Sequence, residues 1–278
     1  MRFDEDGDAP VRVVCRNVDS NTVETLVARR LVLAAGAINS ARLALRSLAG
    51  FGTRVPILCN PNIWVATLNL AMLGRPARDR RYSLAQLTAL QRLPDDPQDY
   101  VLGQFYSYRS LLLFRLLRSL PLPPDLGILF LRYMLTALTL VNIHFSDAPG
   151  TDRWLELRQV GDDDELHANY GRSKDEERRQ RRSERLFLRQ LIRLGCVPIG
   201  ITRPAHGASI HYAGTLPCCD EGRPFTCDSR GRLRGTTHVW VADASTWNFL
   251  PAKGLTFTLM ANARRVAREM MRDLNALG

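Results

Sequence analysis

The residues best suited to chemistry lie near the end of the sequence. His211 opens the segment His-Tyr-Ala-Gly-Thr, and Asp243 follows the apolar residues 239–241. A third element, residues 253–263, begins with Lys-Gly and continues with the pattern of a helix. A neutral imidazole can accept a proton near neutral pH, and the N-terminus of a helix stabilises negative charge. This order of a base, an acidic strand end and a helix start favours a site for a large, phosphate-bearing cofactor.

The N-terminal segment predicts an α/β unit that can position such a site. Residues 11–27 contain two β-forming segments around a polar turn, which predicts a β-hairpin. Residues 30–36 form a short apolar run that ends in glycine, the pattern of a buried strand. Asn39 and Ser40 can then cap a helix that ends near Gly50. A strand that leads through a glycine turn into a helix is typical of α/β folds.

The composition changes from about residue 52, where proline and glycine become frequent. The alternating aromatic residues of 100–108 predict a strand. Two lipophilic helices are expected at about 110–119 and 124–142, and a second hairpin over 154–170 around an acidic turn. This middle region therefore predicts a mixture of sheet and helices.

A capping box at Ser173 and Glu176 predicts the start of a helix over about 174–195. The charge run 176–185 lies on this helix, where an exposed face with i,i+4 ion pairs explains it better than a nucleic-acid surface. The formal net charge of +10 comes mostly from arginine, and no recognised nucleic-acid motif accompanies it. We therefore expect no nucleic-acid partner.

Neither the cysteines nor the apolar segments indicate a metal site or a membrane span. The six cysteines lack the paired spacing of a zinc site, so we expect free thiols in a reducing compartment and no metal. The most lipophilic region, 111–145, is interrupted by charges and prolines, and its longest uncharged piece is shorter than the ~20 residues that span a bilayer. We expect a cytoplasmic protein, with peripheral contact with a membrane left open.

Four motifs, in the same order, resemble those of the glucose–methanol–choline (GMC) flavin oxidoreductases. Residues 30–43 look like the second signature of that family, and His211–Thr215 is similar to its active-site histidine motif. Residues 231–245 resemble the closing segment whose aspartate lies near the flavin, and 253–263 resemble the final helix. Four ordered motifs make a far stronger case than any one of them.

The resemblance implies an FAD-dependent enzyme that oxidises the CH–OH group of an alcohol. His211 would accept the hydroxyl proton while the carbon gives a hydride to the flavin. Gly254 aligns with a second catalytic histidine or asparagine of the family, so that side chain is lost here. The residues that the resemblance places at the cofactor are Ala35, Gly36, Asn39, Asp243, Ala244, Leu255 and Thr256.

The resemblance also implies a division into domains within a mixed α/β (α+β) fold. It is clear over residues 1–50 and 200–278 and weak between them. We therefore expect an incomplete FAD-binding domain formed by 1–50 and 201–278. A sheet-plus-helices domain that binds the substrate is expected to be inserted over 51–200.

The phosphate-binding part of a dinucleotide fold is missing from the sequence. Such a fold needs a strand–GxGxxG–helix unit to hold the pyrophosphate, and Gly50-Phe-Gly52 lacks the third glycine and follows a helix. We expect the C-terminal portion of a longer enzyme. Either the first part is a separate N-terminal FAD-binding polypeptide that acts as partner, or the gene was truncated or its start was misplaced. The alternative is a catalytically silent chain that serves as a binding or assembly module.

The substrate class follows from the resemblance, and the apolar middle region adds a preference. A small-molecule alcohol is the expected substrate, and the lipophilic segment 111–145 favours a bulky apolar one. Packing in a protein core explains the same segment equally well.

Overall fold

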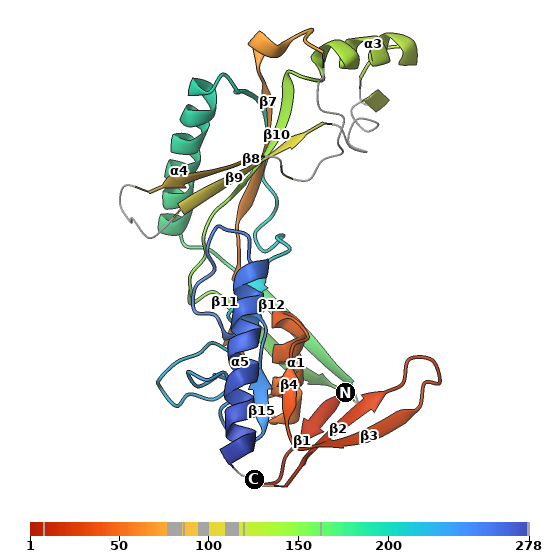
Figure 1. The fold of residues 1–278 in the computed structure, drawn as a ribbon, viewed down its shortest axis with the longest axis vertical. Helices are drawn as coiled ribbons and strands as arrows, with labels where there is room; N and C mark the ends of the chain where they lie inside the picture. Colours follow the sequence, from red (N-terminus) through yellow and green to blue (C-terminus); the bar gives the residue numbers. More distant parts are fainter. Residues whose placement is uncertain are drawn as a thin grey trace. The chain divides into compact units, whose positions relative to one another are not determined.

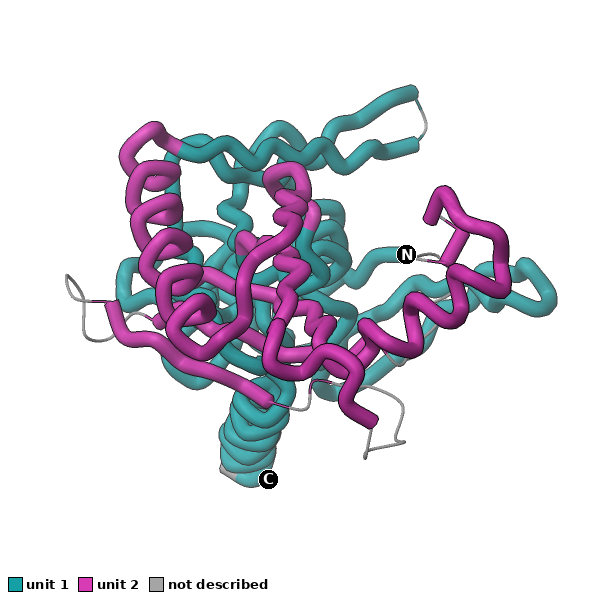
Figure 2. The backbone as a smooth tube through the Cα atoms, turned by 90° about the horizontal axis from the view of Figure 1, so that it is seen from above, with its two compact units in different colours: residues 1–60, 147–172, 209–278 teal, residues 61–146, 173–208 magenta. Residues whose placement is uncertain are grey.

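The computed structural model of the chain describes residues 1–7, 9–76, 85, 87–93, 100–108, 117–118, 120–161 and 163–276. The fold is mixed α/β, as the sequence predicts, and it divides into two units (Figure 2). Unit 1 comprises residues 1–60, 147–172 and 209–278, and unit 2 comprises residues 61–146 and 173–208.

Unit 1 contains four small sheets and two of the long helices (Figure 1). Strands β1, β2 and β3 form one antiparallel sheet and β12, β11 and β5 another, whereas β14 pairs with β6 and β15 pairs with β4. Its elements are β1 (Arg2–Asp4), β2 (Val11–Arg16), β3 (Val23–Ala28), β4 (Leu31–Leu33), α1 (Ala37–Ser47), β5 (Arg54–Pro56), β6 (Leu58–Cys59), β11 (Arg153–Val160), β12 (Asp163–Tyr170), β14 (Tyr212–Ala213), β15 (Val239–Val241), the 3-10 turn η2 (Ala244–Thr246) and α5 (Thr256–Ala276).

The β4–β15 pair is parallel and joins the two ends of the chain. Leu33, Val239 and Val241 are buried in the same core as the apolar side chains of α1. Alternation along a strand points Val32 and Trp240 to the opposite face, where Trp240 is buried and α5 contacts β15. The two strands are thus held between α1 on one face and α5 on the other.

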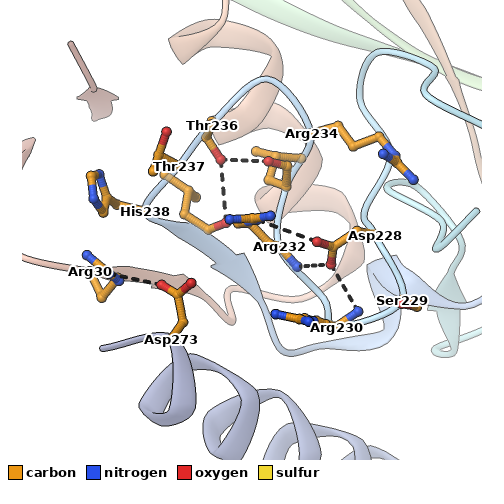
Figure 3. A network of polar contacts seen from close by, with 12 residues as sticks. Arg30, Asp228, Ser229, Arg230, Arg232, Arg234, Thr236, Thr237, His238 and Asp273 are labelled. Carbon is orange, nitrogen blue, oxygen red and sulfur yellow. Dashed lines mark hydrogen bonds and ion pairs between the residues drawn. The ribbon is translucent and has the colours of Figure 1, made fainter. Parts of the chain in front are cut away.

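Polar contacts fix α5 and the loop before β15 to this pair (Figure 3). Arg30, directly before β4, forms an ion pair with Asp273 near the end of α5, at 2.9 Å. Asp228 accepts hydrogen bonds from the backbone N–H groups of Arg230 and Arg232, both at 2.9 Å. This turn brings the backbone that follows it alongside β15.

Unit 2 is built on a five-stranded antiparallel sheet in the order β13-β7-β10-β9-β8. Phe187 and Leu191 of α4 pack against the sheet, and Gly103 lies so close to the Phe187 ring that a Cβ there would be 2.3 Å from it. The elements are β7 (Asn62–Leu68), the 3-10 turn η1 (Leu70–Met72), β8 (Leu87–Arg92), β9 (Tyr100–Ser107), α3 (Pro124–Met134), β10 (Leu138–His144), α4 (Lys174–Arg193) and β13 (Val197–Thr202).

Two helices differ from the sequence predictions. Helix α3 ends at Met134, and residues 138–142, predicted as helical, lie in the central strand β10, which pairs on both edges, with β7 and β9. Helix α1 begins at Ala37 with Gly36 as its N-cap, so Asn39 and Ser40 lie inside the helix.

The helix predicted at 110–119 lies almost entirely outside the described residues. Among the helices of the described ranges, none has both the length and the apolar character that crossing a lipid bilayer requires.

The boundaries of the two units differ from the predicted domains. Residues 51–60 and 147–172 belong to unit 1, and 201–208 belong to unit 2, instead of following the predicted 51–200 insertion. The physical reason is that β11 pairs with β5 and buries Leu155 and Leu157 in the core of unit 1. The assignment of the middle region to substrate binding stays a prediction.

The capping box of α4 gives a first prediction. The Ser173 hydroxyl accepts the Glu176 N–H at 3.2 Å, and the Glu176 carboxylate accepts the Ser173 N–H at 2.8 Å. Ser173→Ala should lower the free energy of unfolding by about 1 kcal/mol, because the Glu176 N–H loses the hydroxyl that accepts its hydrogen bond. Urea denaturation followed by circular dichroism measures this loss. Ser229→Ala, at an exposed serine, is the matched control, and an equal loss in both variants would contradict the prediction.

Candidate active site

The Asp243 carboxylate connects the end of β15 to the turn between β4 and α1. One oxygen accepts the Gly36 N–H at 2.9 Å and the Ser40 hydroxyl at 2.6 Å. The other accepts the Ser245 N–H at 2.9 Å and the Ser245 hydroxyl. Four donors match the acceptor capacity of a carboxylate, so this side chain is committed to contacts within the protein. It holds together the carboxyl ends of two parallel strands, where ligands of open α/β sheets usually bind.

The motif around His211 lies alongside η2 and the start of α1. The Gly214 N–H donates to the Ala244 carbonyl at 2.9 Å, and the buried Thr215 hydroxyl donates to the Ala37 carbonyl at 2.7 Å. Gly214 has φ of 72°, which favours glycine. The Gly-Thr pair of the motif therefore fixes the backbone that carries the histidine.

The His211 imidazole is half-buried at the start of this segment. Its backbone N–H donates to the Ser209 hydroxyl at 3.3 Å, and the next residue, Tyr212, pairs with Cys59 of β6. Burial lowers the pKa of the His211 imidazole below its ordinary value of 6.5. The ring is therefore neutral at pH 7 and can accept a proton.

A single apolar cluster brings the histidine segment and the start of α5 together. It contains Ala213 of β14, Ala244 of η2, Leu58 of β6, and Leu250 and Leu255 before α5. Three of the predicted motifs thus meet in one place, although they are separate in the sequence.

The residues predicted to contact the cofactor at the start of α1 are exposed. Ala35, Gly36 and Asn39 are all accessible, and no atom lies within 4 Å of the position that a Cβ on Gly36 would occupy. Ala244 is buried, and its carbonyl is used by Gly214. The β4–α1 turn therefore presents an open surface made of small residues.

The segment that opens α5 is also open to a ligand. Gly254 is exposed, and a Cβ there would meet no atom within 4 Å. The helix begins at Thr256, and Leu255 anchors it in the apolar cluster. The first N–H groups of a helix have no partner within it, and its dipole is positive at that end.

Sequence reasoning missed a buried ion pair next to the histidine segment. The side chains of Asp147 and Arg153 form an ion pair and are almost inaccessible. The second oxygen of Asp147 accepts the Cys59 N–H at 2.8 Å and the Tyr170 hydroxyl at 2.7 Å. The Asp147 backbone also pairs with Leu250 in both directions. No motif marks these residues: Asp147 lies in the short link between β10 and β11, and Arg153 is the first residue of β11.

Comparison with known proteins agrees with the predicted resemblance. Residues 199–263 match the family model for the C-terminal part of the GMC oxidoreductases, described as GMC oxidoreductase. A crystal structure of pyridoxine 4-oxidase from Mesorbium loti has a similar fold, with a TM-score of 0.58 and 17% sequence identity. No curated protein matches the chain. The resemblance to the GMC oxidoreductases is therefore confirmed over residues 199–263.

The match to the solved structure is uneven in length. It covers 98% of this chain but only 56% of the pyridoxine 4-oxidase chain. The chain thus spans little more than half the length of the pyridoxine 4-oxidase chain, and nearly all of this chain takes part in the shared fold.

The four hydrogen bonds of Asp243 give the second prediction. Asp243→Asn removes the negative charge and places an amide N–H₂ against donors that it cannot satisfy. Since a buried donor that loses its partner costs about 1–3 kcal/mol, the free energy of unfolding should fall by at least about 2 kcal/mol. Guanidinium denaturation measures it. Asp220→Asn, at an exposed aspartate, is the control, and a loss below 0.5 kcal/mol (about the limit for a neutral surface change) in Asp243→Asn would contradict the prediction.

Proposed function

We propose that this chain supplies the proton-accepting side of an FAD-dependent oxidoreductase that acts on the CH–OH group of an alcohol. One observation carries the proposal: Ala213, Ala244 and Leu255 share an apolar cluster. This cluster joins the His211 segment, the end of β15 and the start of α5. The segment that carries His211 and the N-terminus of α5 therefore pack against the same apolar cluster.

The residues present fit the ring end of a flavin. Gly36 and Gly254 leave space where any larger side chain would project, and Ala35 and Asn39 are exposed beside the first of them. When bound, FAD would accept the hydride from the substrate carbon. The first N–H groups of α5, at Leu255 and Thr256, would stabilise negative charge there.

His211 would act on the substrate hydroxyl. Its lowered pKa keeps the imidazole neutral, so the ring is ready to accept the hydroxyl proton as the hydride leaves. Gly254 offers no side-chain donor, so the hydrogen bond to the substrate oxygen falls to His211. Asp243 would act indirectly, because its four bonds hold the turn that carries Gly36.

The phosphate cradle would come from a separate dinucleotide-binding polypeptide. Two features of unit 1 support such a partner. Parallel sheets occur almost only where both faces are covered. In the described residues β4 and β15 form a parallel sheet of two strands, and Val32 of β4 is 40% exposed, so part of this sheet is left uncovered. Helix α5 also presents exposed apolar side chains, with Phe257 86% exposed and Met260 beside it.

A second candidate is a silent chain that acts as a binding or assembly module. Gly254 favours it, because the substrate oxygen loses a side-chain donor. The same exposed face of α5 would then serve assembly alone. The two candidates differ in whether the assembled protein holds FAD and reduces it.

Cofactor binding gives the third prediction. The purified chain alone should not retain FAD through dialysis, because it has no GxGxxG unit for the pyrophosphate. Co-expressed with a GxGxxG polypeptide encoded immediately upstream, it should copurify with FAD, seen as absorbance near 450 nm. Phe257→Asp with Met260→Asp should abolish copurification, while Arg264→Asp with Arg268→Asp, on the same exposed face, should weaken it less.

The outcomes separate the candidates. A complex that forms without FAD supports the assembly module. A chain that holds FAD alone removes the need for a partner, and upstream DNA without a GxGxxG unit eliminates the separate polypeptide.

The role of His211 gives the fourth prediction. In the flavin-loaded protein, His211→Ala should slow reduction of the flavin by an alcohol by about 10²–10⁴-fold, because the hydroxyl proton loses its acceptor. Stopped-flow absorbance at 450 nm measures this with pyridoxine and a series of primary alcohols of increasing chain length. In the unmodified protein the rate should rise with pH and level off, with a midpoint below 6.5, since only the neutral imidazole accepts a proton.

His167→Ala is the matched control, because this partly exposed histidine lies on β12, where its side chain contacts Glu165. It should leave both the rate and the midpoint unchanged. Equal rates in His211→Ala and the unmodified protein would eliminate His211 as the base.

A further inference from the structure

Helix α3 of unit 2 turns its apolar face outward. Leu126, Leu129, Phe130 and Tyr133 follow the i, i+3, i+4, i+7 spacing of a single helix face. Each is between 44% and 64% exposed. A helix on the surface of a soluble domain normally buries its apolar face, whereas α3 leaves these large apolar side chains exposed.

The buried face of α3 explains how the helix keeps this orientation. Gly127 and Leu131, one turn apart, are its buried residues. A Cβ on Gly127 would lie 2.7 Å from the Leu117 side chain, so glycine allows the close approach. At the C-terminal end, the Tyr133 carbonyl accepts the Gly74 N–H at 3.0 Å. The backbone of α3 is thus fixed to unit 2, and the Tyr133 ring lies close to Gly74, while Leu126, Leu129 and Phe130 stay exposed.

The charges beside the apolar face are mostly positive. Arg132 on α3 and Arg118 before it are accessible, whereas Asp125 in the first turn is the one acidic residue of the helix. Long arginine side chains extend along an apolar surface and place their charge in a polar layer. The whole chain carries a formal net charge of +10. These charges complement an anionic surface.

We propose that α3 is a membrane-binding helix that lies in the interface of an anionic lipid bilayer, with Leu126, Leu129, Phe130 and Tyr133 in the lipid. An 11-residue helix is too short to cross a bilayer but long enough to lie in its headgroup region. The apolar face supplies the burial, and Arg118 and Arg132 contact lipid phosphates. This inference is independent of the proposed redox function, because it concerns unit 2 alone.

A lipid surface suits these observations better than a second protein. A tyrosine at one end of the stripe is typical of the boundary between the apolar and polar layers. Arginine next to an apolar face can place its charge among anionic lipid headgroups while its stem covers apolar surface.

The test is sedimentation of the purified full chain with vesicles. The chain should bind vesicles of phosphatidylcholine with about one third phosphatidylglycerol, and bind pure phosphatidylcholine at least about fivefold more weakly, since the arginines lose their anionic partners. Leu126→Ser with Leu129→Ser should weaken binding by about tenfold or more, because two apolar side chains no longer enter the lipid. Arg118→Gln with Arg132→Gln should remove most of the preference for anionic lipid.

A matched control comes from strand β8 of the same unit. Leu87→Ser with Leu90→Ser removes two leucines of similar exposure and should leave vesicle binding unchanged. Equal losses in both double variants would overturn the assignment of binding to α3. All these positions are exposed, so circular dichroism should show the same fold in every variant.

A second measurement reports on the helix itself. In Phe130→Trp, the fluorescence added above that of the four native tryptophans should shift to the blue on vesicle binding and be quenched by brominated lipid chains. Absence of both effects overturns the proposal. A second outcome also overturns it: the chain binds no vesicles, and light scattering shows a concentration-dependent dimer that Leu126→Ser with Leu129→Ser abolishes. In that case α3 binds a second copy of the chain.

Discussion

The Asp243 carboxylate is the interaction on which unit 1 depends. Its hydrogen bonds to Gly36 and Ser40 connect β15 to the turn that follows β4, and those to Ser245 shape η2. A parallel pair of two strands has little pairing of its own, so a charged acceptor at its end supplies stability that further strands would otherwise give. The η2 carbonyls in turn accept hydrogen bonds from the segment that follows His211, which places this histidine next to the junction.

Asp147 has the corresponding role on the other side of the histidine. It holds the Cys59 N–H, and Cys59 pairs with Tyr212 directly after His211. Its backbone also pairs with Leu250, just before the segment that opens α5. The Asp243 and Asp147 carboxylates, whose partners all lie within the protein, therefore hold the His211 segment and the segment that leads into α5 in place. The positions left open to a ligand, Gly36 and Gly254, are the ones without a side chain.

The sequence predicts the parts of the site that have local signatures. The motif around His211, the small residues before α1 and the capping box at Ser173 are local patterns, and the structure contains each of them. Asp147 and Arg153 could not be found in this way, because their importance arises from partners far apart in the sequence. The helix prediction for residues 138–142 was wrong for a related reason. An apolar run suits a helix or a strand, and here pairing with β7 and β9 on both edges makes it a strand.

The two exposed apolar faces differ in what surrounds them, and this difference separates their partners. On α5, Phe257 and Met260 belong to the unit whose strand β4 has an exposed Val32, so a packed protein partner can bury apolar side chains and continue a sheet. On α3, the exposed side chains of Leu129 and Phe130 have an arginine of the same helix, Arg132, near them. A fluid surface needs no matching backbone, only apolar depth and an anionic boundary. The backbone available at each face, and not its hydrophobicity, therefore distinguishes a protein partner from a lipid one.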